Sequence, residues 1–308
     1  MNIKNLSMSF GIQEIFDDIT LHINDNEKVG IIGMNGAGKS TFFNLILGKL
    51  EPDKGSIIFK PGTRIGFLPQ VISDEIPSMD ISVFDYLLEG RPIKKLENEL
   101  ADAYTEAATE TDEKKIKILM KRIGKLQEKL EYFEVYNAEN ILLKIVTGMN
   151  IDSELLDMKL CNLSGGQKSK IAFARLLYSK PEVLLLDEPT SNLDIKHQID
   201  VTKTLSLLPK AKGMLVIMIS HDINITAKYA DRIIMLAGGG IFADGTPKEV
   251  LTKENIRTVY GVDADVIDVN GRPHIILNDC LDDAYIPTDL GPVDWSDSII
   301  SLGSGVGW

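Results

Sequence analysis

A short stretch near the N-terminus has the residue types and the spacing of a phosphate-binding loop. From Gly33 to Thr41 the sequence reads GMNGAGKST and fits G-x-x-x-x-G-K-[ST] at every fixed position. Glycines in such a loop let backbone N–H groups close around phosphate oxygens without a Cβ in the way. Lys39 is predicted to reach the β- and γ-phosphates of a nucleoside triphosphate, and the Ser40 hydroxyl to ligate Mg²⁺.

The segments on both sides of this loop fit the same chemistry. The motif is meaningful only where a strand enters the loop and a helix leaves it. An apolar run over 28–32 predicts the strand, and the helical spacing from Phe42 to Leu50 predicts the helix. The positive end of that helix adds to the attraction for phosphate. We therefore expect the nucleotide to contact Asn35, Gly36, Ala37, Gly38, Lys39, Ser40 and Thr41.

Two adjacent carboxylates end a second predicted strand. The apolar run over 183–186 leads directly into Asp187 and Glu188, and another apolar run, over 214–219, precedes His221. In an open α/β sheet, side chains at these strand ends lie beside the phosphate loop. One carboxylate can then hold the Mg²⁺ shell while its neighbour orients or deprotonates a water. The sequence thus predicts a hydrolytic centre.

Together with LSGGQ at 163–167, these motifs resemble those of the ATP-binding cassette (ABC) ATPases, over roughly residues 1–278. The resemblance implies an α/β fold: a P-loop NTPase core of the ABC type, with an antiparallel β subdomain and a helical subdomain that carries an extended hairpin. It also implies ATP and Mg²⁺ as cofactors, with Glu188 and His221 as catalytic residues. Further ATP contacts are implied for Phe10, Gln70, Ser164, Gly165, Gly166, Gln167 and Asp194, and the implied Mg²⁺ ligands are Ser40, Gln70 and Asp187.

Two of these assignments carry further expectations. Phe10 matches the aromatic that stacks on adenine in the family, although an aromatic in a strand is also an ordinary core residue. In the family two cassettes close head to tail, and the signature of one, here Ser164 to Gln167, caps ATP held by the other. Since the sequence has one phosphate loop, we expect a second cassette as a partner, either a copy of this chain or a paralogue.

Composition agrees with an ATPase that is not inserted in a membrane. The chain has 308 residues, of which 44% are hydrophobic and 25% charged, as is ordinary for a globular protein. No apolar run approaches a membrane span, and the first residues lack the cationic-then-apolar pattern expected of a signal peptide. We therefore expect a cytoplasmic protein, peripheral at the inner face of the membrane. Cys161 and Cys280 have no metal or redox spacing, and the net charge of −12 disfavours broad contact with nucleic acid.

The chain is expected to form an ATPase domain over 1–278 with a helical subdomain at about 71–160. Within it, two amphipathic helices, Lys94 to Ala108 and Asp112 to Phe133, predict a hairpin whose charges are nearly balanced. This hairpin is either a solvated element or an arm that binds a partner. Further expectations are a helix from Pro247 to Val259, a terminal β-hairpin over about 262–278 that turns at Asn270-Gly271, and an acidic, weakly ordered tail over 279–308.

The two halves of the chain resemble different branches of the ABC family. Through about Pro189 it is similar to the ABC-F proteins, soluble ATPases that act on the ribosome, in SVFDYL at 82–87, in the long hairpin and in GQKSK at 166–170. The later part is similar to the ATPase subunits of iron-siderophore and cobalamin importers, in DIKHQ at 194–198 and in YADRIIML at 229–236.

The single cassette and the importer-like C-terminal extension favour an importer ATPase that energises a separate membrane permease for iron-siderophore or cobalamin-type substrates. The alternative is an ABC-F-like, ribosome-associated ATPase, a translation or antibiotic-resistance factor, and a hybrid of the two branches is a further interpretation. A non-catalytic regulatory module is disfavoured, because Lys39, Asp187, Glu188 and His221 are all present.

Overall fold

The computed structural model describes residues 1–70, 80–189, 198–199, 201–202, 205 and 213–280. The strands are β1 (Asn2–Phe10), β2 (Gln13–His22), β3 (Lys28–Gly33), β4 (Lys54–Ile58), β5 (Ile65–Leu68), β6 (Val183–Asp187), β7 (Leu215–Ile219), β8 (Arg232–Ala237), β9 (Gly240–Gly245), β10 (Val262–Val269) and β11 (Arg272–Cys280). The α-helices are α1 (Lys39–Ile46), α2 (Val83–Leu88), α3 (Ile93–Thr109), α4 (Glu113–Tyr132), α5 (Ala138–Gly148), α6 (Gly165–Tyr178), α8 (Ile223–Tyr229), α9 (Pro247–Val250) and α10 (Lys253–Tyr260). Short 3₁₀ turns are η1 (Val135–Asn137), η2 (Ser153–Asp157) and η3 (Leu160–Asn162).

A six-stranded sheet forms the centre of the molecule, with the strand order β5-β6-β7-β3-β8-β9. Its neighbours pair in parallel except for β8 and β9, which are antiparallel. Strands β6 and β7 are almost continuously apolar because both faces of a parallel sheet are covered by other elements. Parallel pairing brings the carboxyl ends of β3, β6 and β7 to one edge, as the sequence predicted for the carboxylates and the phosphate loop.

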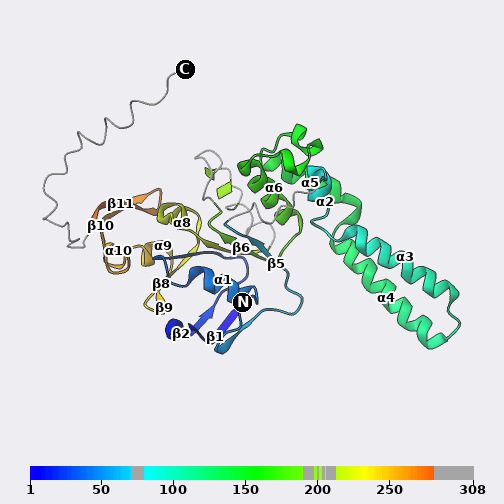
Figure 1. Cartoon of the computed structure of the whole chain (residues 1–308), viewed down its shortest axis with the longest axis horizontal. Coiled ribbons are helices and arrows are strands. Elements are labelled where there is room, and N and C mark those ends of the chain that lie inside the picture. Colours follow the sequence, from blue (N-terminus) through cyan, green and yellow to red (C-terminus); the bar gives the residue numbers. More distant parts are fainter. Residues whose placement is uncertain (71–79, 190–197, 200, 203–204, 206–212, 281–308) are drawn as a thin grey trace, which may run out of the picture.

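Helix α1 lies between the central sheet and a three-stranded antiparallel sheet of order β2-β1-β4 (Figure 1). Its apolar side chains Phe42, Phe43, Leu45 and Ile46 share one buried cluster with residues of both sheets. The helix begins at Lys39 and ends at Ile46, so it starts earlier and is shorter than the run over 42–50 that the sequence indicated. Side chains of β6 alternate between the two faces of the central sheet: Leu185 packs in the α1 cluster, and Leu184 packs with α6.

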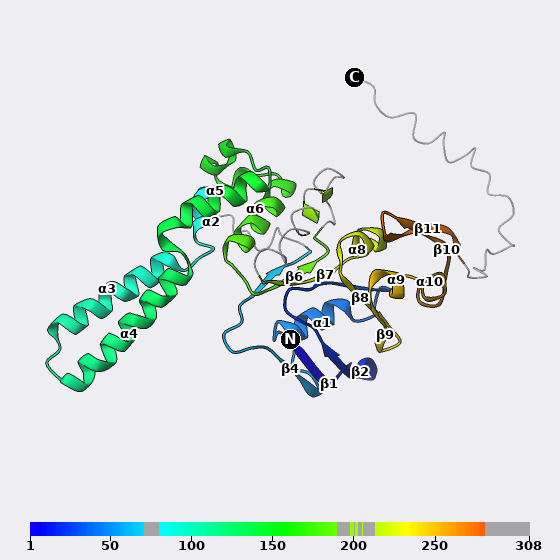
Figure 2. The ribbon, with the colours of Figure 1, turned by 180° about the vertical axis from the view of Figure 1, so that it is seen from behind.

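Helices α8, α9 and α10 cover the β8 side of the sheet, and the hairpin of β10 and β11 lies at that end of the molecule (Figures 1 and 2). The single helix expected from Pro247 to Val259 is wrong: α9 ends at Val250 and α10 begins at Lys253. Thr252 separates them because its side chain accepts a hydrogen bond from the backbone of Asn255 and caps α10. The predicted β-hairpin is confirmed, and β11 continues to Cys280. Residues 281–308, which contain nearly all of the expected tail, lie outside the described part of the chain.

The helical region contains a hairpin of α3 and α4 that projects from the body at the end opposite to β10 and β11 (Figures 1 and 2). The two predicted helices are confirmed, each within a few residues of the expected bounds. Asp112 caps α4 by accepting a hydrogen bond from the backbone of Lys114. The hairpin is held by a small buried cluster of its own: Leu96, Ala103, Ile123, Leu126, Leu130 and Phe133.

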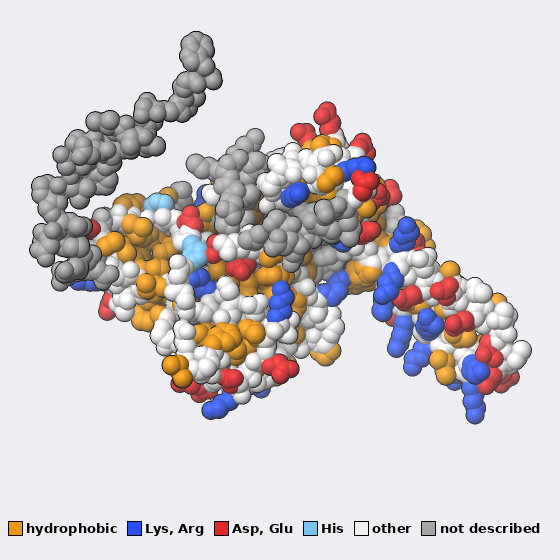
Figure 3. Space-filling model, viewed as in Figure 1, with side chains coloured by type: hydrophobic (Ala, Val, Ile, Leu, Met, Phe, Trp, Pro, Cys, Tyr) orange, Lys and Arg blue, Asp and Glu red, His pale blue; other side chains and the backbone are white. Residues whose placement is uncertain are grey.

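The charges of the hairpin are balanced in sum but not in space. In Figure 3 the Lys and Arg side chains gather along one edge of the projecting arm. Helix α4 carries seven Lys and Arg residues against three Glu, whereas α3 carries two Lys against three Glu and one Asp. The near-neutral count from the sequence therefore conceals a basic helix beside an acidic one.

Candidate functional site: a phosphate loop and a carboxylate cluster

The phosphate loop links the end of β3 to the first turn of α1. Gly38 is the N-cap of α1 with φ 90°, and its lack of a side chain leaves the first N–H groups of the helix uncapped. A Cβ at this position would lie 2.7 Å from side-chain atoms of Ile15 and Phe16, so only glycine fits. Uncapped donors at the positive end of a helix suit an anion. The loop therefore fits the phosphates of ATP.

Lys39 is the buried cation of the site. Its side chain is 7% exposed, and Nζ donates hydrogen bonds to the carbonyl oxygens of Gly33 (2.8 Å) and Met34 (2.9 Å). Burial lowers the pKa of Lys39, while the nearby carboxylates Glu188 and Asp187 act in the opposite direction. The lysine thus lies close enough to the two acids for their charges to influence it.

Glu188 is held from two sides at the end of β6. Nε2 of Gln70 donates to Oε2 of Glu188 at 2.8 Å, and Nε2 of His221 lies 2.6 Å from Oε1. The backbone of Glu188 is in the left-handed region (φ 49°), which is uncommon for a residue with a Cβ and costs on the order of 1 kcal/mol or more. Its N–H donates to the carbonyl of Ile219 on β7 (3.0 Å). Two segments distant in sequence, at Gln70 and at 219–221, thus hold Glu188 in place.

Asp187 is half-buried at the end of β6. Burial raises its pKa, and repulsion from Glu188 adds to the shift, while His221 and Lys39 act in the opposite direction. A carboxylate whose charge is unfavourable in the fold gains most from a nearby cation. Oxygen ligands from Ser40, Asp187 and Gln70 are the type that Mg²⁺ prefers, so the residues present fit the ion.

The remaining expected contacts are placed as follows. Phe10 ends β1 and is 49% exposed, so it is not packed in the core. Asn35, Gly36 and Ser40 are exposed in the loop, and Ala37 and Thr41 are half-buried. Asp194 lies outside the described residues.

The signature segment belongs to a different part of the molecule from the phosphate loop. Ser164 is the N-cap of α6, its Oγ accepts from the backbone of Gln167, and the side chain of Gln167 accepts in return from the backbone of Ser164. With this capping box, α6 begins at Gly165, directly after Ser164. Gly165 is exposed and Gly166 half-buried. Cys161, just ahead of the signature, and Cys280, at the end of β11, are exposed free thiols.

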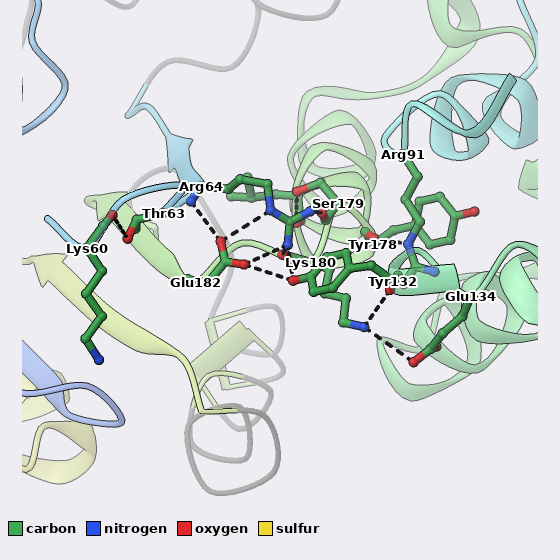
Figure 4. A network of polar contacts seen from close by, with 11 residues as sticks. Lys60, Thr63, Arg64, Arg91, Tyr132, Glu134, Tyr178, Ser179, Lys180 and Glu182 are labelled. Carbon is green, nitrogen blue, oxygen red and sulfur yellow. Dashed lines mark hydrogen bonds and ion pairs between the residues drawn. The ribbon is translucent and has the colours of Figure 1, made fainter. Parts of the chain in front are cut away.

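Sequence reasoning missed a polar network beneath the helical region (Figure 4). Arg64 donates to Glu182 (Nη2 to Oε1, 3.0 Å) and to the hydroxyl of Tyr132 (2.5 Å), and its guanidinium stacks on the Tyr132 ring. Arg91 donates to the carbonyl oxygens of Tyr178 (2.7 Å) and Phe133 (2.5 Å). The network joins the base of the α3–α4 hairpin to the end of α6 and the start of β6. Its partners are more than 40 residues apart, so no local pattern could reveal it.

Comparison with known proteins fits this geometry. A family model described as ABC transporter matches residues 16–191. The chain belongs to the ABC transporter family. As an ABC ATPase, it binds and hydrolyses ATP. In the described part of this ABC chain, no helix has the length and apolar content that a membrane span requires.

Relatives of this ABC ATPase include importer subunits. The hemin import ATP-binding protein HmuV of Bordetella avium is 32% identical over 280 residues, which cover 86% of this chain and 93% of HmuV. The ferric enterobactin transport ATP-binding protein FepC of Escherichia coli K12 is 30% identical over 287 residues, which cover 89% of this chain and 92% of FepC.

Two solved structures share the fold. A metal-chelate type ABC transporter in an inward-facing conformation matches with a TM-score of 0.64 at 24% identity, over 90% of this chain and 96% of that one. The dimeric ATP-binding cassette MJ0796 bound to ADP and Pi matches with a TM-score of 0.52 at 22% identity, over 80% of this chain and 97% of that one.

Proposed function

We propose that this ABC ATPase is the ATP-binding subunit of a membrane importer for iron-siderophore or cobalamin-type substrates. The observation that carries the proposal is the extent of the match to HmuV and FepC, which spans nearly nine-tenths of this chain. Relatives named for hemin import and ferric enterobactin transport favour a metal chelate as cargo and support the importer branch over the ribosome-associated one.

In the proposed mechanism, Lys39 and the first turn of α1 hold the phosphates of ATP. Glu188 orients the attacking water and accepts its proton, because its two oxygens are fixed by Gln70 and His221. Ser40, Asp187 and the amide oxygen of Gln70 would hold Mg²⁺, which neutralises phosphate charge when bound. The strained backbone of Glu188 keeps the carboxylate in one orientation before the nucleotide arrives.

The proposal includes a second cassette. The hydrogen bonds of Ser164 and Gln167 described above lie within α6, and Gly165 is exposed beside them. This exposed helix start is an N–H-rich surface that suits the terminal phosphate of ATP bound to another subunit. Closure would then place ATP between two chains at a cytoplasmic site at the inner face of the membrane.

The test is reconstitution with a permease. The chain is co-expressed with the permease of a neighbouring gene, and uptake of a ferric siderophore or cobalamin into proteoliposomes is measured with ATP. Wild-type chain should support uptake, and Lys39→Ala should co-purify with the permease yet support none. Firm co-purification with ribosomes, without any membrane partner, would contradict the importer assignment.

A further inference from the structure

Helix α4 presents a face rich in Lys and Arg, which contains one carboxylate, Glu128. At about 100° per residue, its seven Lys and Arg side chains fall within an arc of about 160°. The opposite side of the helix carries Ile123, Leu126 and Leu130, which are buried against α3. The basic face therefore points away from the hairpin interior, as Figure 3 shows along the edge of the arm.

Only two of these cations are neutralised within the hairpin. Arg122 pairs with Glu106 (3.4 Å), and Lys115 pairs with Glu110 (3.5 Å). The other five are exposed and form no ion pair with any residue that the structure describes. We call these five the lysine row: Lys114, Lys117, Lys121, Lys125 and Lys129.

The lysine row is costly to the isolated protein. Lys117, Lys121, Lys125 and Lys129 are spaced four apart, so like charges stand one above another over roughly 18 Å of helix. Such pairs are mildly destabilising, and no described residue forms an ion pair with the row. An external anionic surface of similar length would offset it.

We propose that the lysine row docks on a membrane surface that contains anionic phospholipids. Lysine is suited to this role, because its compact ammonium on a flexible stem is attracted to headgroups without fixed geometry. Ile118 lies in the middle of the row on the helical wheel and is 68% exposed. An apolar side chain among lysines can enter the headgroup region while the charges stay at its surface.

The composition of the row argues against RNA as the partner. Sequence-specific recognition of RNA relies on arginine forks and on aromatic rings that stack on bases, whereas lysine contributes only a point charge. The row contains only lysine, and the one arginine of the face, Arg122, is paired with Glu106. The one aromatic residue within the cationic arc of α4 is Tyr132, and its ring is already covered by Arg64 and Lys180.

Because the whole chain is acidic, the lysine row determines how the protein is oriented on an anionic membrane. With a formal charge of −12, the protein is repelled by an anionic bilayer except where cations are concentrated. Docking through α4 therefore fixes the hairpin axis along the bilayer plane. The inference uses the proposed transport function only for its expectation that a membrane is nearby, and the test below needs neither permease nor ATP.

The test measures sedimentation of the full chain with vesicles of phosphatidylcholine and phosphatidylglycerol, and with vesicles of phosphatidylcholine alone. The test variant replaces Lys117, Lys121 and Lys125 by Gln. The matched control replaces three exposed lysines outside the hairpin by Gln: Lys4, Lys54 and Lys144. Glutamine keeps helix propensity close to that of lysine, and circular dichroism with ATP binding confirms folding.

We expect wild-type chain to bind only the anionic vesicles and to be released by salt. The test variant should bind about a hundredfold more weakly at low salt, since each lysine near such a surface contributes roughly fivefold, and the control should bind like wild type. Absence of binding to anionic vesicles, or equal weakening of the control, would overturn the proposal. Tighter binding to polyuridylate that depends on the same three lysines would replace the membrane by RNA. Either failure leaves the transport assay unaffected.

Discussion

Glu188 is the residue on which the hydrolytic assignment depends most directly. One oxygen of Glu188 accepts a hydrogen bond from Gln70 and the other lies beside His221, which fits the proposed role of a general base. We expect Glu188→Gln to bind ATP normally and to lower turnover by ~10²–10⁴-fold. Steady-state phosphate release measures the effect, with the exposed Glu51→Gln as the control. Turnover within twofold of wild type would reject the role.

Asp187 illustrates a conflict between stability and function. Its pKa is raised, chiefly by burial and then by repulsion from Glu188, so the ionised form is unfavourable in the nucleotide-free fold. Because the folded pKa of Asp187 is above the unfolded one, its contribution to the free energy of unfolding is fully present below the unfolded pKa, about 3.9. That contribution is lost as the pH rises through the folded pKa.

Asp187→Asn should therefore stabilise the nucleotide-free protein at neutral pH, on the order of 1 kcal/mol, while it impairs hydrolysis. Urea unfolding at neutral pH and near the unfolded pKa of Asp measures the free energies of unfolding of the variant and of wild type. The difference between them should shrink in acid. Asp157→Asn, at an exposed position, is the control. If Asp187→Asn were less stable than wild type at neutral pH, the ionised form of Asp187 would be stabilised by its surroundings, contrary to this prediction.

At the scale of elements, the Arg64 network joins the hairpin to the two elements that lead to the site. Helix α6 begins at the signature and ends at the network, and β6 begins beside Glu182 and ends at Asp187. For Glu182 the largest single influence is burial, which raises its pKa, but hydrogen bonds from Arg64 and Tyr132 outweigh it and the net pKa is lowered. Its stabilising effect is then present above the unfolded pKa, about 4.3, and is lost as the pH falls through the folded value.

We expect Glu182→Gln to destabilise the chain by about 1 kcal/mol at neutral pH, a modest value because the side chain is 41% exposed. The difference from wild type should disappear in acid. Denaturant titrations across pH test this, with Glu134→Gln at the rim of the network as a comparison. If Glu182→Gln and Glu134→Gln lowered the free energy of unfolding equally, the Arg64–Glu182 pair would have no particular stabilising role.

Local patterns predicted most elements, and the exceptions have physical reasons. The strands over 183–187 and 215–219 were predictable because apolar runs followed by polar residues mark buried strands. The break at Thr252 was missed because apolar spacing continues across it, although a Thr three residues before Asn255 was a capping signal. The phosphate loop was predictable because its chemistry is local. The contacts of Arg64 and the meeting of Gln70 with Glu188 depend on tertiary packing, and charge counts could not show that the cations of α4 share one face.

For the whole molecule, the main prediction is that one active site is shared by two chains. Lys39→Ala removes the phosphate ligand, and Ser164→Arg blocks the exposed start of α6. Each variant alone should be inactive. If one composite site suffices, each heterodimer should recover about half of the wild-type activity, which is about a quarter for an equal, randomly assorted mixture. ATPase assays on the mixture and on each variant alone measure this.

Full activity of Ser164→Arg at concentrations where the chain is monomeric would contradict a shared site. Size-exclusion chromatography of Glu188→Gln with ATP provides an independent readout, because slow hydrolysis should preserve the closed dimer. A chain that remains monomeric under that condition would also argue against the arrangement.

The two exposed cysteines are natural attachment sites for a fluorescent dye. Cys161 lies three residues before Ser164, and Cys280 ends β11 at the side of the molecule away from the hairpin. With Cys280→Ser, a single environment-sensitive dye can be attached at Cys161 without any engineered site. Its emission would follow the approach of a second subunit in real time, and the dye on Cys280 alone would record motions of the opposite end.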